Sequence, residues 1–228
     1  MFRWKKLGRV FNPTKVENLS WLKEYAQAPS VLVFDKFIRV YFSGRPHPDK
    51  NGQYVSYTGF IDLDRTNLFE ILKVSQQPIL PLGNKGTFDE FGIYPVSVLR
   101  LENQIIAYYG GWTRCESVPF NVAIGLAVSD NLGESFEKAG SGPVLSYSLN
   151  EPFILSGPKI RIFKNRFYLY YIAGSKWVKN NGKLDPIYKI RMATSEDGIN
   201  WKRENKNLIN DKTDDNEAQA SPDVFLAN

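Results

Sequence analysis

Four prolines divide this chain into units of similar length, and this repeat constrains the fold more than any other feature of the sequence. They are Pro29, Pro95, Pro158 and Pro222, and the intervals between them are 66, 63 and 64 residues. Alternating apolar residues follow each proline, as in Val96-Ser-Val-Leu, and this period of two is typical of a β-strand. Self-similarity at a nearly fixed interval indicates a repeat architecture in which each unit is one supersecondary structure.

Each complete unit has the same order of predicted elements. The alternating strand leads through a polar turn into an aromatic-rich second strand, such as Ile105-Ile-Ala-Tyr-Tyr, which is the pattern of a β-hairpin. A third strand follows, and a fourth is expected around the apolar pair that ends each unit. Segments 129–136 and 195–201, which precede the fourth strand in two units, are rich in the Asn, Asp and Gly of tight turns. The apolar pairs are Ile79-Leu80, Val144-Leu145 and Leu208-Ile209.

Four antiparallel strands in each unit predict an all-β fold in which every unit is one blade of a β-propeller. Blades are expected at 28–81, 94–146 and 157–210, with a partial fourth unit at 221–228 and a strand at 3–11 that closes the last blade. A five-bladed ring would need on the order of 320 residues. These 228 residues are therefore interpreted as one propeller domain truncated after about three and a half blades. Open edges in such a ring predict self-association, partial disorder or a longer parent protein.

The composition narrows the chemistry that such a fold could carry. One cysteine, Cys115, excludes an internal disulfide framework, and one histidine, His47, excludes a Cys/His zinc site. The 29 Lys and Arg residues are interspersed with 24 Asp and Glu, which argues against a nucleic-acid surface and leaves a mild attraction to anionic sugars open. No cofactor or metal ion is expected, because the acidic run 211–217 offers oxygen ligands without the spacing of an EF-hand loop.

The sequence also carries information about location. The longest apolar runs are far shorter than the roughly 20 residues that a membrane span requires, so no membrane partner is expected. The N-terminal residues are basic but lack the apolar stretch of a secretory signal. Together with the single cysteine, these features favour a reducing, cytoplasmic setting.

Carboxylates recur in the segments that lead into the predicted first strands. In a propeller these strands line the central axis, so the preceding segments are expected to converge on one mouth of the channel, where a pocket is expected. Asp89, Glu151 and Glu217 are the acidic candidates, and Gln27 holds the corresponding place in the first unit. The alternative for each acid is structural, as a turn cap for Asp89 and as an exposed loop residue for the other two.

Aromatic and basic residues recur where the second strands end. Arg45, Trp112, Arg114 and Trp177 lie at matching places in the three units. Such residues suit a sugar site, because ring faces stack on pyranose C–H surfaces and guanidinium groups bind hydroxyls or carboxylates. Packing between blades is the alternative, and it is favoured for Trp177.

Several motifs resemble those of the five-bladed β-propellers of the glycoside hydrolase family 43 type. They are Phe88-Asp-Glu-Phe-Gly-Ile-Tyr-Pro, Val40-Tyr-Phe-Ser-Gly-Arg, Ala123-Ile-Gly-Leu-Ala-Val-Ser-Asp and Ser195-Glu-Asp-Gly-Ile-Asn-Trp. The likeness is strongest to a branch that is often encoded among polysaccharide biosynthesis genes. The resemblance implies a carbohydrate-active protein that acts on a glycosidic bond, with an oligosaccharide or a sugar phosphate as its ligand.

The resemblance also implies roles for the three acids. In that clan three carboxylates serve as general base, general acid and positioning residue, and by position these would be Asp89, Glu151 and Glu217. Glu217 would be the proton donor if apolar neighbours raise its pKa. The sequence departs from the pattern in the first unit, where Gln27 stands in place of an aspartate and cannot act as a base. Two functions therefore stay open, namely hydrolysis or phosphorolysis, and non-catalytic binding of a sugar or nucleotide sugar.

Overall fold

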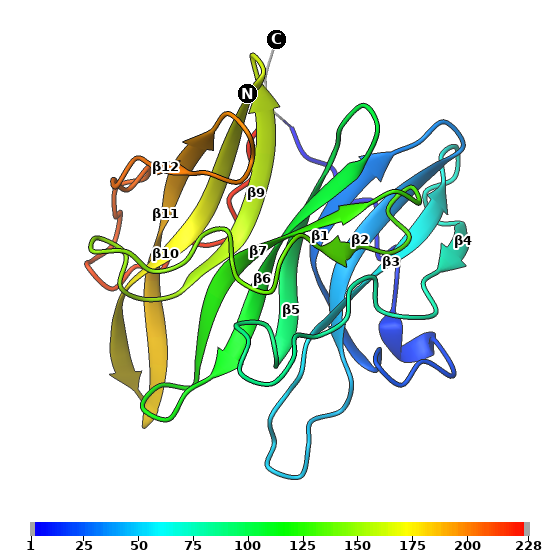
Figure 1. The fold of residues 1–228 in the computed structure, drawn as a ribbon. Helices are drawn as coiled ribbons and strands as arrows, with labels where there is room; N and C mark the ends of the chain where they lie inside the picture. Colours follow the sequence, from blue (N-terminus) through cyan, green and yellow to red (C-terminus); the bar gives the residue numbers. More distant parts are fainter. Residues whose placement is uncertain (1–2, 226–228) are drawn as a thin grey trace.

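Three four-stranded antiparallel sheets, one for each complete repeat, lie side by side in the computed structural model, which describes residues 3–225 (Figure 1). The strands follow one another along the chain within each sheet, so the predicted all-β fold with four-stranded antiparallel units is confirmed. The described helical structure is η1 (Pro13–Lys15), and no helix in this part of the chain is long and apolar enough to cross a membrane. Sheet 1 contains β1 (Glu24–Val33), β2 (Phe37–Arg45), β3 (Tyr57–Asp64) and β4 (Ile71–Val74); sheet 2 contains β5 (Gly92–Arg100), β6 (Ile105–Arg114), β7 (Phe120–Ser129) and β8 (Glu137–Lys138); sheet 3 contains β9 (Leu155–Phe163), β10 (Arg166–Asn180), β11 (Lys183–Ser195) and β12 (Lys202–Arg203).

The middle sheet is buried on both faces by apolar clusters. One cluster lies between sheets 1 and 2 and includes Tyr41, Phe60 and Tyr109. The other lies between sheets 2 and 3 and includes Tyr108 and Leu169. Successive side chains of a strand point to opposite faces, so the neighbours Tyr108 and Tyr109 belong to different clusters. This double burial explains why β6 is a continuous apolar and aromatic run instead of an alternating one.

A buried tyrosine on the second strand of one sheet binds the turn that precedes the fourth strand of the next sheet. The Tyr41 hydroxyl donates to the Gly133 carbonyl at 2.9 Å, and the Tyr108 hydroxyl donates to the Gly198 carbonyl at 2.7 Å. Both glycines have positive φ, and each donates its N–H to the serine that begins its turn. The two predicted turns therefore dock sheet 2 onto sheet 1 and sheet 3 onto sheet 2.

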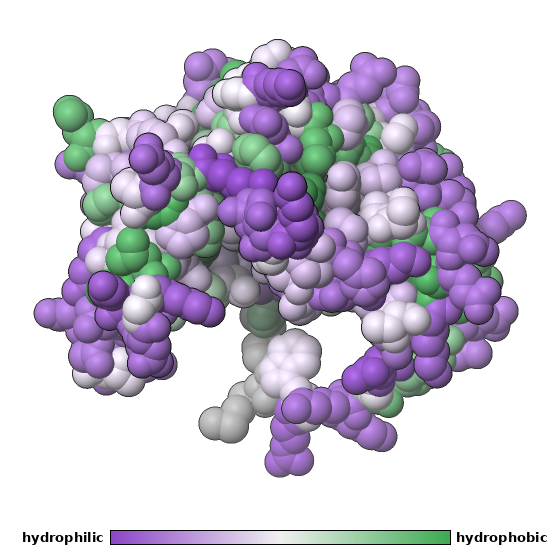
Figure 2. All heavy atoms as spheres, turned by 90° about the horizontal axis from the view of Figure 1, so that it is seen from below, coloured by the Kyte–Doolittle hydropathy of each residue, from purple (hydrophilic) through white to green (hydrophobic). Residues whose placement is uncertain are grey.

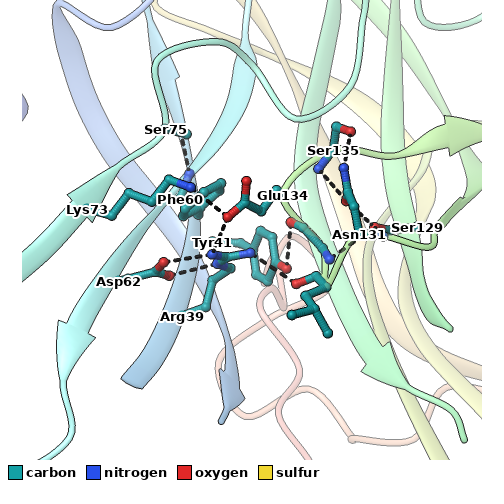
Figure 3. Close-up of polar contacts among 12 residues, drawn as sticks. Arg39, Tyr41, Phe60, Asp62, Lys73, Ser75, Ser129, Asn131, Glu134 and Ser135 are labelled. Carbon is teal, nitrogen blue, oxygen red and sulfur yellow. Dashed lines mark hydrogen bonds and ion pairs between the residues drawn. The ribbon is translucent and has the colours of Figure 1, made fainter. Parts of the chain in front are cut away.

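Arg39 adds a buried polar link between sheets 1 and 2 (Figure 3). Its Nε and Nη2 atoms donate to the two carboxylate oxygens of Asp62 at 2.7 Å each, and its Nη1 donates to the carbonyl of Leu132 in the sheet 2 turn at 3.0 Å. The guanidinium carbon lies 3.8 Å from the centre of the Phe60 ring. A forked ion pair combined with a cation–π contact compensates the burial of this charge.

The fourth strands lie earlier in the sequence than predicted, because β4, β8 and β12 all precede the apolar pairs that were assigned to them. Ile79, Leu80 and Leu145 are nevertheless buried beside the third strand, whereas Leu208 and Ile209 are 37% and 42% exposed. Ile79 donates its N–H to the carbonyl of Thr58, and Leu145 donates to that of Ile124. The apolar character of the first two pairs thus reflects burial beside the third strand, which the sequence pattern cannot distinguish from strand formation.

Residues 3–11 do not form the predicted strand that closes a last blade. Val10 and Phe11 instead pack on the face of sheet 1 that points away from sheet 2, and the Phe11 ring lies 5.0 Å from the Phe42 ring. This apolar face buries the segment without requiring it to join a sheet. The predicted first strand of the partial fourth unit is also absent at 222–225, and 226–228 lie outside the described residues.

Candidate functional site

The four repeated prolines meet at one cavity of about 610 Å³, named the axial cavity. Each proline and the residue before it line its wall, so the predicted convergence of the repeats is observed. Ala28 and Ser221 have φ values of 50° and 54°, a left-handed conformation that is costly for residues other than glycine. Such strain clusters at ligand sites, which supports this cavity as the candidate site. The lining pairs are Ala28-Pro29, Tyr94-Pro95, Gly157-Pro158 and Ser221-Pro222.

A second cavity of about 750 Å³, named the outer cavity, adjoins the first. The two cavities share Arg45, Trp112 and Phe120 in their walls. The β6–β7 connection and the β10–β11 hairpin border the outer cavity, and both lie at the lower end of the molecule (Figure 1). From below, that end carries mostly hydrophilic residues and shows a recess between the lobe on the left and the rest of the face (Figure 2). Together the cavities have room for a ligand larger than one sugar ring.

Arg45, the last residue of β2, is the cation at the junction of the two cavities. Its Nε donates to the Ser56 hydroxyl at 3.0 Å. Its guanidinium carbon lies 5.3 Å, 5.2 Å and 5.9 Å from the ring centres of Tyr25, Tyr54 and Tyr94. These rings hold the guanidinium group by cation–π contacts without neutralising its charge. The structure thus places this predicted binding residue in both cavity walls.

Trp112 also lies in both walls, as predicted for a binding residue. Its indole Nε1 donates to the carbonyl of Tyr94 at 2.6 Å, and its ring centre lies 4.4 Å from that of Phe120. Trp177 packs edge-on against the other side of this group, 5.5 Å from the Phe120 ring. Its contact therefore agrees with the packing interpretation.

The two remaining predicted binding residues lie farther from the junction. Arg114 lines the outer cavity, with its guanidinium group 4.3 Å from the centre of the Phe91 ring and 3.8 Å from the carboxylate of Asp49. Gln27 is half-buried in β1 opposite Ser43, between two register shifts, and does not line either cavity.

Asp89 does not face the axial cavity as predicted. Its side chain is 1% exposed, and Oδ2 accepts from the Tyr109 hydroxyl at 3.0 Å and pairs with Lys138 Nζ at 2.6 Å. Lys138 belongs to β8, the outermost strand of sheet 2, so the carboxylate lies over the sheet and away from the axis. The physical reason is that the half-buried ammonium of Lys138 and the buried hydroxyl of Tyr109 both need this acceptor.

Glu151 repeats this arrangement one unit later. It is completely buried, and its Oε1 accepts from the Tyr171 hydroxyl at 2.8 Å. Arg203 of β12 and Arg191 of β11 form ion pairs with it, the latter at 3.3 Å. Like Asp89, it therefore joins the start of its unit to the outer strand and lies outside the axial cavity wall.

Sheet 1 contains an apolar version of the same arrangement. Strand pairing places Val74, Lys138 and Arg203 at the same position of the three fourth strands. Leu22 and Phe42, which correspond to the carboxylate and the tyrosine, belong with Val74 to one apolar cluster. Apolar side chains in sheet 1 thus occupy the positions that the carboxylate, the tyrosine and the base occupy in the other two sheets. This favours a packing role, the structural alternative, for Asp89 and Glu151.

Glu217 is also placed differently from the prediction of a proton donor. Its carboxylate accepts from the backbone N–H groups of Lys212 and Thr213 at 2.8 Å and 3.0 Å. These hydrogen bonds, the one from Lys212 most strongly, hold its pKa below the usual value, whereas a general acid requires a raised pKa. Among residues 3–225, no group of three or more His, Cys, Asp and Glu side chains is arranged to hold a metal ion.

Sequence reasoning missed several residues of the axial cavity wall. Asp223 contributes a carboxylate there and pairs with Lys159 at 3.0 Å and with Arg161 at 2.9 Å. Lys159, Tyr94 and Tyr188 line the same wall. Three of these residues adjoin a repeated proline, which was an available signal, because residues beside an axial proline must lie near the axis. Tyr188, on β11, carried no such signal.

Comparisons with known proteins place this fold. No protein-family model matches the chain. Proteins MT1551 and Rv1502 of Mycobacterium tuberculosis, from strains CDC 1551 and H37Rv and both described as uncharacterized, are each 31% identical to it over 222 residues. The match covers 97% of this chain and 71% of each relative. The chain belongs to their family. The similarity to its members thus extends over almost the whole of this chain.

Comparison with solved structures identifies the fold of this chain. A glycoside hydrolase matches with a TM-score of 0.68 at 15% identity, covering 90% of this chain and 62% of that protein. Zg3597 of Zobellia galactanivorans, a family 117 glycoside hydrolase, matches with a TM-score of 0.62 at 18% identity, covering 88% of this chain and 51% of that protein. A complex of BT0996 with RGII matches with a TM-score of 0.59 at 14% identity, covering 78% of this chain and 52% of that protein. The described part of this chain therefore has the fold of propeller-type glycosidases.

Proposed function

We propose that the axial cavity binds a carbohydrate and that the protein is a carbohydrate-active propeller of the five-bladed, glycoside hydrolase family 43 type. The observation that carries this proposal is the cavity wall, which combines the cation of Arg45 with the aromatic side chains of Trp112, Tyr94 and Tyr188. Aromatic faces stack on pyranose C–H surfaces, and guanidinium groups donate forked hydrogen bonds to hydroxyls and charged substituents. The glycosidase-like fold and the RGII complex among the similar structures support the same ligand class.

Binding without hydrolysis is the activity that the cavity geometry favours. Acid–base hydrolysis needs two carboxylates about 5.5 Å apart for retention, or about 6.5 to 9.5 Å apart for inversion. Of the residues that the structure describes, Asp223 supplies the carboxylate in the axial cavity wall, and two cations already neutralise it. Asp89 and Glu151 are instead enclosed between sheets.

Hydrolysis or phosphorolysis is the second candidate function. It is favoured by fold likeness to a glycoside hydrolase and to a structure described as belonging to the GH130 family of mannoside phosphorylases. In that case Asp89, Glu151 and Glu217 remain the predicted catalytic residues. A role in polysaccharide biosynthesis is also part of the proposal and rests on the family 43 resemblance, and a cytoplasmic setting rests on the single cysteine.

A glycan array followed by calorimetry of the best ligand tests the proposal. Trp112→Ala should weaken binding by about tenfold, because stacking in the cavity is lost. Trp4→Ala is the matched control, since Trp4 is 86% exposed and lies outside both cavities. Long incubation without product would favour binding alone, and product formation would favour the second candidate. Failure to bind any glycan, or equal binding by the Trp112→Ala variant, would overturn the cavity assignment.

A further inference from the structure

Arg45 forms no ion pair with a carboxylate in the described part of the chain. Glu24, its partner in the pairing of β1 with β2, feels its charge but binds His47 and Tyr54. The other buried or half-buried arginines in the sheets form such an ion pair, as Arg39 does with Asp62, Arg161 with Asp223 and Arg203 with Glu151. No carboxylate oxygen of residues 3–225 lies within 4.0 Å of the Arg45 guanidinium nitrogens, and its protein hydrogen bond there uses Nε. Its two Nη atoms, the ends of the fork, thus remain for another acceptor.

The position of this arginine is as informative as its pairing. Arg45 borders both the axial and the outer cavity, so an acceptor bound to it would lie between the two. The Ser56 bond and three tyrosine rings fix the guanidinium plane, which lowers the entropy cost of forming a forked contact. The outer cavity wall also holds Arg114 and Lys183, whose charges Glu116 and Asp185 balance, so Arg45 is the cation at the junction itself.

We propose that Arg45 binds a phosphate group held between the two cavities, so that the ligand is a phosphorylated sugar with its ring in the axial cavity. Guanidinium groups match phosphate geometry with two parallel hydrogen bonds, and a half-buried site strengthens them relative to water. This inference rests on the proposed carbohydrate binding and adds the chemical class of the ligand. Arg45 could also bind inorganic phosphate next to a neutral sugar. The experiment below distinguishes a phosphate that is part of the sugar ligand from inorganic phosphate.

Calorimetry with matched ligand pairs tests the inference on the wild-type protein. The pairs are the 1-phosphates and the methyl glycosides of glucose, galactose, mannose and N-acetylglucosamine, and inorganic phosphate is titrated alone and with each methyl glycoside. We expect at least one sugar phosphate to bind about tenfold or more tightly than its neutral partner, with a preference that falls as salt is added. If inorganic phosphate competes with that sugar phosphate, the bound phosphate group belongs to a sugar ester. If inorganic phosphate binds together with the methyl glycoside, the site binds free phosphate beside a neutral sugar.

Variants then assign the effect to Arg45. Arg45→Gln should abolish the preference for phosphate, and Arg45→Lys, which keeps the charge and loses the fork, should retain part of it. Arg65→Gln is the matched control, because Arg65 is exposed and lines neither cavity. The wild-type comparison stands even if a variant does not fold.

Three results would overturn the inference, and they are distinguishable from one another. If both members of every pair bind with equal affinity and inorganic phosphate does not bind, the phosphate site is excluded and the proposal of carbohydrate binding stands. A preference that survives in a folded Arg45→Gln variant would remove Arg45 as its cause. No binding of any sugar would overturn the proposed function and this inference together.

Discussion

Asp89 and Glu151 show how the same residue type can suggest catalysis in a sequence and serve packing in the fold. Each carboxylate lies between two sheets and receives a tyrosine hydroxyl and a basic side chain from the outer strand. Buried ion pairs add little net stability over well-packed apolar residues, but removing one member leaves an uncompensated charge. Sheet 1, with Leu22, Phe42 and Val74 at these positions, is the natural apolar comparison.

Asp89→Asn is expected to destabilise the protein by about 3 kcal/mol, because Lys138 loses its buried counter-ion. The triple variant Asp89→Leu, Tyr109→Phe, Lys138→Val copies the sheet 1 residues and should recover part of this loss. Urea unfolding measures both effects. A fully stable Asp89→Asn variant that loses carbohydrate turnover would instead support the catalytic prediction for Asp89.

The sequence could place Asp89 and Glu151 along the chain but not orient their side chains. The proline repeat correctly located the residues that converge on the axis, because strand phase is visible as a period of two. Which way a loop side chain turns depends on the partner it meets, and Lys138 is far away in sequence. The recurrence of an acid, a tyrosine and a base at matching positions was a signal for the structural role.

At the scale of elements, strand order was predictable and strand ends were not. The apolar pair Ile79-Leu80 was assigned to a strand because it is buried, yet it lies in a connection that reaches the third strand through the bond from Ile79 to Thr58. The prediction for 3–11 failed for a related reason. Apolar residues such as Phe11 report burial, and the surface that buries them is set by the packing of sheet 1.

The tyrosine contact between sheets 2 and 3 should contribute measurably to stability. Tyr108→Phe removes the 2.7 Å hydrogen bond to the Gly198 carbonyl and leaves that acceptor without its partner. We expect a loss of about 1 to 2 kcal/mol in the free energy of unfolding. Tyr147→Phe, at an exposed tyrosine, is the control and should change stability little. Equal effects in the two variants would contradict the docking role of the turn.

The hydrogen bonds of Asp197, in the turn before β12, should make the stability of the protein depend on pH in the acid range. Hydrogen bonds to Asp197, first from the Asn200 backbone and side chain and then from the Ile199 backbone, lower its pKa from the usual 3.8. A lowered folded pKa means that this stabilisation is complete above the unfolded pKa and is lost as the pH falls toward the folded one. The melting temperature should therefore be level near neutral pH and fall below about pH 4. Asp197→Asn should make that fall shallower; an unchanged acid profile would exclude this contribution.

At the scale of the whole molecule, the outward faces of sheets 1 and 3 differ from the buried middle sheet. Ser30 points toward sheet 2, where it accepts from the Val98 N–H, so alternation turns Val31 and Val33 to the opposite face. These valines are 51% and 55% exposed, and Phe163, at the end of β9, is 45% exposed. Apolar side chains gathered on sheet faces favour association with another apolar surface.

We therefore expect self-association through the outward face of sheet 1. Sedimentation velocity should show a larger species that grows with protein concentration. The double variant Val31→Lys, Val33→Lys should shift the equilibrium toward monomer, because it places two charges on this face and leaves the contact of Ser30 with Val98 untouched. Lys36→Glu, a charge change on the exposed turn between β1 and β2, is the control for altered charge alone. A monomer at all concentrations would contradict this prediction, and association that persists in the double variant would move the contact to another face.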